Sequence, residues 1–210
     1  MNKLVLLLFF IGSCMAWDYL MFVQYWPTTW INRDHIKNTN FTNDHFNVHG
    51  IWPQYNNGSY PQFCNKTVKF DPSQLAPIRS DLAKYWTDYH NGERFLMHEF
   101  YRHATCAETD SLLNTELKFF GKGLDFRTKH NLYQYLTDNH IYPSNNQTYN
   151  RQEIYDAIQK NIPTNIAMTC PGGILDSVMI CTDAGLNLIN CPVYLNTCRT
   201  NTLSYNFINY

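Results

Sequence analysis

The sequence has no run of lysine and arginine residues, and its 16 basic residues are outnumbered by 17 acidic ones. Proteins that bind nucleic acid at neutral pH normally carry clustered positive charge, so that footprint is missing at pH 7. All eight histidines follow residue 16, however. If most were protonated near pH 5, the net charge of residues 17–210 would change from −2 to roughly +6. We therefore expect the chain to attract a polyanion only in an acidic compartment.

No apolar run after residue 16 is long enough to span a bilayer. The first 16 residues combine Lys3, an apolar stretch and small residues up to Ala16, which is typical of a secretory signal peptide cleaved after Ala16. We therefore expect residues 1–16 to be removed and residues 17–210 to form a single domain without a membrane anchor. Its destination is outside the cell or a lysosome- or vacuole-like compartment, and a monomer is the default because no strong dimer signal is present.

The chain also lacks any Cys-x-x-Cys pair, which disfavours a zinc or redox-active thiol site. Six cysteines remain once Cys14 leaves with the signal peptide, and an even number in an exported chain predicts three disulfides, with fifteen pairings possible. Four Asn-x-Ser/Thr sequences are candidate glycosylation sites in exposed segments, and they start at Asn40, Asn57, Asn65 and Asn146.

Hydrophobic spacing predicts strands at both ends of the chain and helices in the middle. The expected strands are 17–30, 46–53, 165–170, 174–183 and 188–195. The expected helices are 71–90, 95–106, 111–120, 128–136 and 151–159, with Gly121 and Gly123 separating the third from the fourth. This order predicts an α+β fold with a central, mainly antiparallel sheet flanked by helices.

The stretch 95–106 contains the densest chemistry in the chain. Read as a helix, it places His98, Glu99, Arg102 and His103 within an arc of roughly 140°. Histidine exchanges protons near neutral pH, so this face suits acid–base chemistry. A zinc site of the His-Glu-x-x-His type is disfavoured because the two histidines are five positions apart and diverge by about 140° on a helix. A solvated polar face is the other alternative, and His49, alone on a strand near a turn, would in isolation be structural.

Two segments taken together are specific: Val48-His-Gly-Ile-Trp-Pro53 and His98-Glu-Phe-Tyr-Arg-His-Ala-Thr-Cys106. They resemble the two active-site motifs of the ribonuclease T2 family, the secreted and vacuolar acid ribonucleases, and the resemblance covers essentially all of residues 17–210. It implies an α+β fold and cleavage of single-stranded RNA through a 2′,3′-cyclic phosphate. It also implies little base specificity and no metal or other cofactor.

The resemblance assigns a role to each charged residue of the two motifs. His103 looks like the general base for the 2′-hydroxyl, and His49 like the general acid for the leaving 5′-oxygen. Glu99 and Arg102 would stabilise the transition state, and His98 would contact phosphate. Two histidines with pKa values near 6 can hold opposite protonation states in mild acid, which suits concerted proton transfer.

Three further residues are candidates for contact with a base. Trp52 offers a flat face for stacking, although it could equally be a core residue. Phe95 is a candidate for a second base site. Gln54 stands where the family often has an aspartate that influences base preference. The resemblance also implies the disulfide pairs Cys64–Cys106, Cys170–Cys198 and Cys181–Cys191.

Two departures from the family pattern leave an alternative open. Arg102 replaces the usual lysine, which keeps the charge but changes hydrogen-bond geometry. Ala104 replaces a glycine, which is acceptable if residue 104 is helical and costly if it needs a positive φ. A catalytically silent relative that binds RNA or a protein partner therefore remains an alternative to an active enzyme, and an unrelated secreted hydrolase or lectin with a metal site is a third.

Overall fold

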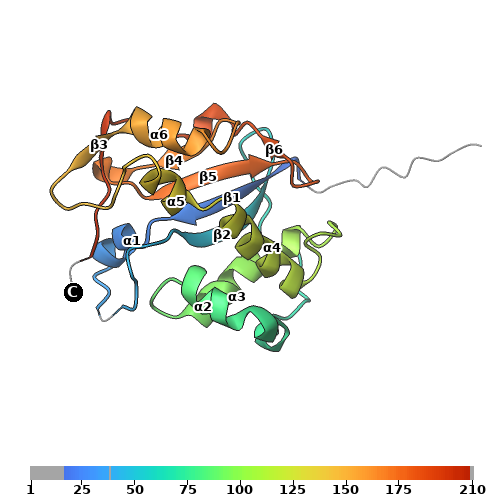
Figure 1. The fold of residues 1–210 in the computed structure, drawn as a ribbon. Helices are drawn as coiled ribbons and strands as arrows, with labels where there is room; N and C mark the ends of the chain where they lie inside the picture. The colour runs from blue at the N-terminus through green and yellow to red at the C-terminus, as the bar shows by residue number, and fades with distance from the viewer. Residues whose placement is uncertain (1–16, 38, 209–210) are drawn as a thin grey trace, which may run out of the picture.

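The computed structural model describes residues 17–37 and 39–208. The expected signal peptide, residues 1–16, lies outside the described residues. A five-stranded antiparallel sheet forms the centre of the molecule (Figure 1), with the order β2-β1-β5-β4 and with β6 also paired to β5. Its strands are β1 (Tyr19–Tyr25), β2 (Asn47–Gln54), β4 (Ala167–Thr169), β5 (Ser177–Thr182) and β6 (Leu188–Ile189). The predicted α+β fold is confirmed.

Helices lie on several sides of this sheet. In Figure 1, α2 and α3 lie below β2, and α6 lies near β4 beside β3, whereas α4 packs against β1 and β2. The helices are α1 (Pro27–Arg33), α2 (Arg79–Tyr85), α3 (Gly92–Arg102), α4 (Glu116–Lys129), α5 (Leu132–Thr137) and α6 (Arg151–Gln159). The outer strands are β3 (Thr148–Asn150) and β7 (Thr202–Ser204), and four 3₁₀ segments span Pro72–Ile78, Ala104–Cys106, Pro171–Gly173 and Val193–Leu195.

The central strands bury both of their faces. Leu20 and Phe22 of β1 point into the large core beneath the helices, whereas Tyr19 and Met21 point into a smaller cluster on the opposite face. This alternation follows the two-residue period of a strand. A strand buried on both sides has little freedom to shift its register, so β1 is a fixed reference for the residues paired to it.

Several predicted boundaries are wrong for physical reasons. The expected strand 17–30 ends at Tyr25 because Pro27 begins α1, and the last expected strand reduces to β6 followed by a 3₁₀ turn. Gly121 and Gly123 lie inside α4 rather than between helices. A Cβ on Gly123 would lie 2.2 Å from the ring of Trp86, so this glycine provides room for close packing instead of ending the helix.

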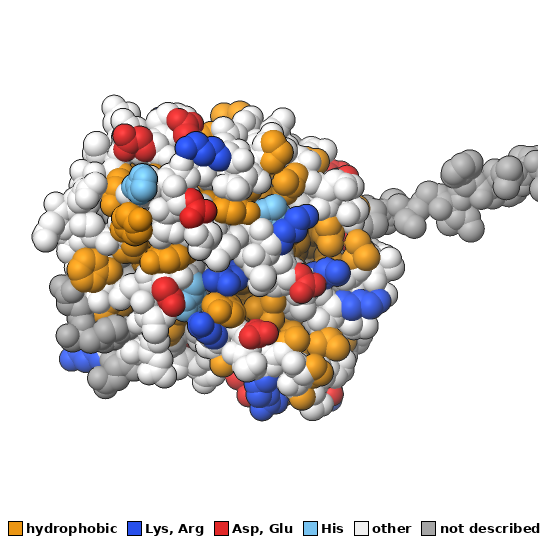
Figure 2. Space-filling model, in the orientation of Figure 1, with side chains coloured by type: hydrophobic (Ala, Val, Ile, Leu, Met, Phe, Trp, Pro, Cys, Tyr) orange, Lys and Arg blue, Asp and Glu red, His pale blue; other side chains and the backbone are white. Residues whose placement is uncertain are grey.

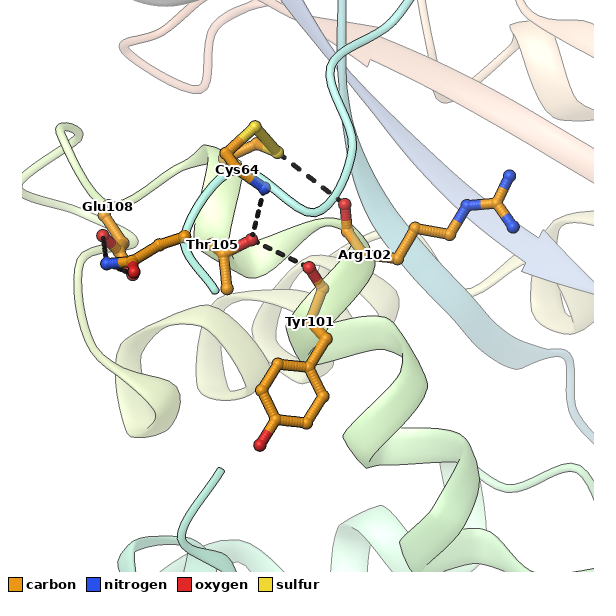
Figure 3. Close-up of a disulfide and its surroundings, with 7 residues drawn as sticks. Cys64, Tyr101, Arg102, Thr105 and Glu108 are labelled. Atoms are coloured by element: carbon orange, nitrogen blue, oxygen red, sulfur yellow. Dashed lines mark hydrogen bonds between the residues drawn. A yellow bond between two sulfur atoms is a disulfide. The ribbon is translucent and has the colours of Figure 1, made fainter. Parts of the chain in front are cut away.

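Three disulfides are present, Cys64–Cys106, Cys170–Cys198 and Cys181–Cys191, and these are the pairs that the resemblance implies. The first joins the loop after β2 to the end of α3, where the Cys64 amide also donates to Thr105 Oγ1 over 3.1 Å (Figure 3). It closes a loop with a sequence separation of 42. In a chain-entropy model such a bond contributes about 4 kcal/mol to stability.

Among residues 17–37 and 39–208, no helix is long and apolar enough to cross a membrane. Three of the four candidate glycosylation residues are exposed, namely Asn40, Asn57 and Asn146. Asn65 is only half-exposed, because its amide nitrogen donates to both carboxylate oxygens of Glu108 over 3.2 and 2.9 Å. The exposed side chains are therefore the more accessible acceptors for a glycan.

Candidate active site

His49 is the extra residue of a β-bulge in β2. Val23 of β1 pairs with Gly50, and the next residue, Gln24, pairs with Val48, so His49 has no partner opposite it. A bulge of this kind changes the direction of side chains on the bulged strand and is common next to active sites. Here it allows Val48 and Ile51, three positions apart, both to enter the large core, while His49 lines a cavity.

Gly50 brings β2 into close contact with α3. A Cβ on Gly50 would lie 2.0 Å from Glu99 Oε2 and 2.3 Å from Trp52 Nε1, which no real side chain could tolerate. The absence of this Cβ lets the Trp52 indole N–H donate to Glu99 Oε2 over 3.0 Å. Glu99 Oε1 lies 4.0 Å from His49 Nε2. The glycine therefore makes possible a buried contact between the two motifs.

The end of α3 supplies the remaining polar groups. Asn91 caps the start of the helix by accepting a hydrogen bond from the Arg94 amide, and the last helical residue is Arg102. His103 is the C-cap, with φ −120° and ψ −49°, so the expectation that all four motif residues lie within one continuous helix is wrong. The change in backbone direction still brings His103 into the same cavity as His98, Glu99 and Arg102.

Trp52 packs against both catalytic candidates. Its ring stacks on His103 with centroids 5.2 Å apart and meets His49 edge-on at 4.7 Å. His49 is enclosed further by Trp30 at 4.7 Å, Phe95 at 5.6 Å and Tyr25. Trp52 therefore contacts both imidazoles, with its ring stacked on His103 and nearly perpendicular to His49.

The cavity has a volume of about 470 Å³. Seven of its lining residues are ones that the sequence predicted, namely His49, Trp52, Gln54, His98, Glu99, Arg102 and His103. Phe95 is not among the lining residues, because its buried ring packs against His49 and Trp30 instead. The remaining five lining residues were not predicted, namely Met21, Gly58, Tyr60, Tyr194 and Leu195.

Burial dominates the titration of the three groups around Trp52. It lowers the pKa of His49 to about 3 and that of His103 to about 2, with smaller contributions from neighbouring cations that include Arg102. It raises the pKa of the Glu99 carboxyl to about 8. The expectation of two histidines with pKa values near 6 is therefore wrong for the site without substrate. Burial therefore favours the neutral form of both imidazoles and of the Glu99 carboxyl.

The same effect reduces the positive charge expected at pH 5. Burial also lowers the pKa of His130 to about 4, so His49, His103 and His130 all remain neutral at that pH. The expected net charge of roughly +6 at pH 5, which needs all eight histidines to be protonated, is therefore too high. On the face shown in Figure 2, basic and acidic side chains are interspersed rather than clustered.

Arg102 provides the fixed positive charge of the cavity. Its guanidinium extends away from the disulfide and toward the strands (Figure 3), and Nη2 donates to the Tyr60 hydroxyl over 3.4 Å. Within the described residues, Arg102 Nε is a buried donor that has no acceptor. His98 lies nearby with much of its side chain exposed, and partial desolvation, followed by the charge of Arg102, lowers its pKa. A guanidinium with a free donor, beside an imidazole, suits an anion with several oxygens.

Ala104 does not disturb this arrangement. It lies in the 3₁₀ turn Ala104–Cys106 and is not among the non-glycine residues with positive φ in the described chain. The strain that would follow from a positive φ at this position is therefore absent. Among the described residues, no group of three or more His, Cys, Asp or Glu side chains is placed to hold a metal ion.

Comparison with known proteins identifies the family. The profile of the Ribonuclease T2 family matches residues 17–191. The chain belongs to the ribonuclease T2 family. It is 30% identical to intracellular ribonuclease LX of Solanum lycopersicum in an alignment of 190 residues that covers 84% of this chain and 78% of that protein. It is 29% identical to extracellular ribonuclease LE of the same species in an alignment of 212 residues, gaps included, that covers 91% of each chain.

Solved structures of the ribonuclease T2 family share the fold. The crystal structure of RNase NT in complex with 5′-AMP superposes with a TM-score of 0.76 at 28% sequence identity, covering 90% of this chain and 98% of that one. Of the cavity residues that sequence reasoning missed, Tyr60 had a usable signal, because it is an aromatic residue in a polar loop soon after the first motif. Tyr194 and Leu195 had none, because they come from a segment with no link in sequence to either motif.

Proposed function

We propose that this ribonuclease T2 family protein is an active endoribonuclease that cleaves single-stranded RNA by transphosphorylation, without a metal ion. The observation that carries the proposal is the packing of His49 and His103 on one indole, with Glu99 bonded to that indole and Arg102 in the same cavity. Concerted transfer of a phosphoryl group needs one proton acceptor, one proton donor and a fixed cation.

In the proposed reaction, His103 is the general base. Its lowered pKa keeps the imidazole neutral in mild acid, so it can accept the proton of the 2′-hydroxyl. The 2′-oxygen then forms a bond to phosphorus as the bond from phosphorus to the 5′-oxygen breaks. The products are a 2′,3′-cyclic phosphate and a free 5′-hydroxyl. The imidazole N–H that His103 gains is later lost to solvent.

His49 is the proposed general acid, and it must carry a proton when the 5′-oxygen leaves. Without RNA, burial favours a neutral His49 and a protonated carboxyl on Glu99, 4.0 Å away. The negative charge of a bound phosphate favours a cation, so it would shift the proton from Glu99 to His49. On this account RNA binding itself prepares the acid.

Arg102 and His98 are the proposed ligands of the non-bridging oxygens. Arg102 lines the cavity, and within the described residues its Nε has no acceptor. A preorganised donor of this kind typically contributes about 3–4 kcal/mol to transition-state stabilisation. Because Arg102 retains the charge and Ala104 lies in an unstrained turn, neither departure from the family pattern favours a silent relative.

The proposal also includes low base specificity of the cleavage and export of the protein through the secretory route. Trp52, Gln54 and Tyr60 line a cavity of about 470 Å³, and the related RNase NT structure contains 5′-AMP. Residues 1–16 and the three disulfides support entry into the secretory route. The named relatives include both an extracellular and an intracellular enzyme, so the final compartment differs within the family.

The test is cleavage of single-stranded RNA by purified, disulfide-bonded protein across the range from acid to neutral pH, with EDTA throughout. We expect cleavage in mild acid that EDTA does not reduce, and products that carry 2′,3′-cyclic ends. Cleavage that stops in EDTA would contradict the metal-free mechanism. The absence of cleavage at every pH, together with measurable RNA binding, would favour the silent relative.

A further inference from the structure

The cavity has a wall that neither sequence motif supplies. Tyr194 and Leu195, from the 3₁₀ turn Val193–Leu195, line it together with Gly58 and Tyr60 of the loop after β2. Leu195 and Trp52 pack against the small apolar cluster that contains Met21. The cavity therefore extends beyond the catalytic groups into a space bounded by aromatic and aliphatic side chains.

The turn that carries Tyr194 is fixed at both ends. Cys191, just before it, is bonded to Cys181 of β5, and Cys198, just after it, is bonded to Cys170. Within the segment, the Leu195 amide donates to the Pro192 carbonyl over 3.1 Å. A segment held in this way loses little conformational entropy when a ligand binds against it.

Tyr194 is held at its tip while its ring stays accessible. Its hydroxyl lies 3.1 Å from the hydroxyl of Tyr19, which is 1% exposed, whereas Tyr194 itself is 47% exposed. On its other side the ring is close to the loop after β2, because a Cβ on Gly58 would lie 3.7 Å from it. An accessible aromatic ring fixed in this way is a surface suited to a nucleobase.

The position of this wall indicates which base it contacts. Trp52, whose ring stacks on His103, packs with Leu195 against the apolar cluster that contains Met21. His49 is instead enclosed by Trp30, Phe95 and Tyr25. The space beside Tyr194 is therefore not on the enclosed side of His49, the proposed general acid. We propose that Tyr194 is a specificity-determining residue that contacts the base of the nucleotide whose 2′-oxygen attacks.

The assignment rests on the proposed RNA cleavage, and the test keeps the two apart. The substrates are dinucleoside monophosphates that vary either the first base (ApU, GpU, CpU, UpU) or the second (UpA, UpG, UpC). The variants are Tyr194→Ala, Tyr194→Phe and the control Val193→Ala, whose side chain is 80% exposed and does not line the cavity. Binding of the four nucleoside 3′-monophosphates is measured in parallel, because it needs no turnover.

We expect Tyr194→Ala to lower kcat/KM by roughly ten-fold or more for dinucleotides with the preferred first base, mainly by raising KM. The differences in kcat/KM among the four first bases should become smaller. The ranking of second bases should not change. Tyr194→Phe keeps the ring and should keep the first-base ranking, and Val193→Ala should behave as the native protein does. The 3′-monophosphates should lose affinity for Tyr194→Ala in the same order.

Equal losses for all four first bases, or a change in the second-base ranking, would overturn the assignment. So would unchanged binding of all four 3′-monophosphates to Tyr194→Ala. If native protein cleaves no dinucleotide, the proposed function fails, and the binding series still decides whether Tyr194 contacts a base. Far-ultraviolet circular dichroism and a free-thiol assay check that each variant is folded with its disulfides intact.

Discussion

Replacing Gly50 with alanine tests the contact between the two motifs. The new Cβ would lie 2.0 Å from Glu99 Oε2 and 2.3 Å from Trp52 Nε1, so both side chains must move. Overpacking of this kind costs about 1–3 kcal/mol, and a buried polar group left without its partner costs about 1–3 kcal/mol more. We therefore expect Gly50→Ala to lower the free energy of unfolding by about 2–6 kcal/mol.

Activity should fall further than stability alone would explain. The displaced groups position His49 and His103, and a misplacement of about 1 Å at such a site can reduce the rate about 100-fold. The assay is kcat/KM for a dinucleotide, measured well below the denaturation midpoint of the variant, beside urea unfolding curves. Gly121→Ala is the matched control, because no atom lies within 4 Å of its Cβ, and it should be neutral or stabilise α4 by about 0.5–1 kcal/mol. If Gly50→Ala matched the native protein in rate and unfolding midpoint, the proposed contact would be wrong.

Two further predictions concern stability. Replacing Cys64 and Cys106 together with serine should lower the free energy of unfolding by about 4 kcal/mol in urea, and an unchanged midpoint would contradict the entropic role of the bond. Burial raises the pKa of Glu99 in the folded protein from its ordinary value of 4.5 to about 8. Between these two pH values the folded state therefore binds more protons than the unfolded state. The free energy of unfolding should consequently fall as the pH rises through this window. Glu99→Gln should therefore flatten the fall in unfolding free energy between pH 7 and pH 8, and an equally steep fall in the variant would refute the assignment.

The sequence alone identified the chemistry of the site but not its geometry. The two motifs predicted His49, Glu99, Arg102 and His103, and all four line one cavity. The bulge at His49 could not be predicted, because it depends on how β2 pairs with β1. The C-cap position of His103 depends on contacts made after the helix, such as the bond from Thr105 Oγ1 to the Tyr101 carbonyl.

The fold was predictable where local signals decide the structure. Helix α6 has the predicted bounds, and a capping box between Asn150 and Glu153 fixes its start within the chain itself. The prediction ended a helix at residue 120, before Gly121 and Gly123, because glycine usually weakens a helix. In the structure α4 continues to Lys129, and packing against Trp86 outweighs that cost at Gly123. The wall at Tyr194 was missed because distant disulfides and the partner Tyr19 create it.

The division of labour between the two histidines is the central claim, and one comparison tests it most directly. His49→Ala and His103→Ala are assayed on a dinucleotide and on uridine 3′-(4-nitrophenyl phosphate), whose leaving group needs no proton. Because general acid or base catalysis typically contributes about 10²–10⁴-fold, both variants should lose at least that much on the dinucleotide. On the aryl ester, His49→Ala should recover most of its activity and His103→Ala should not. Equal losses for the two variants on the aryl ester, or recovery by His103→Ala instead, would contradict the account.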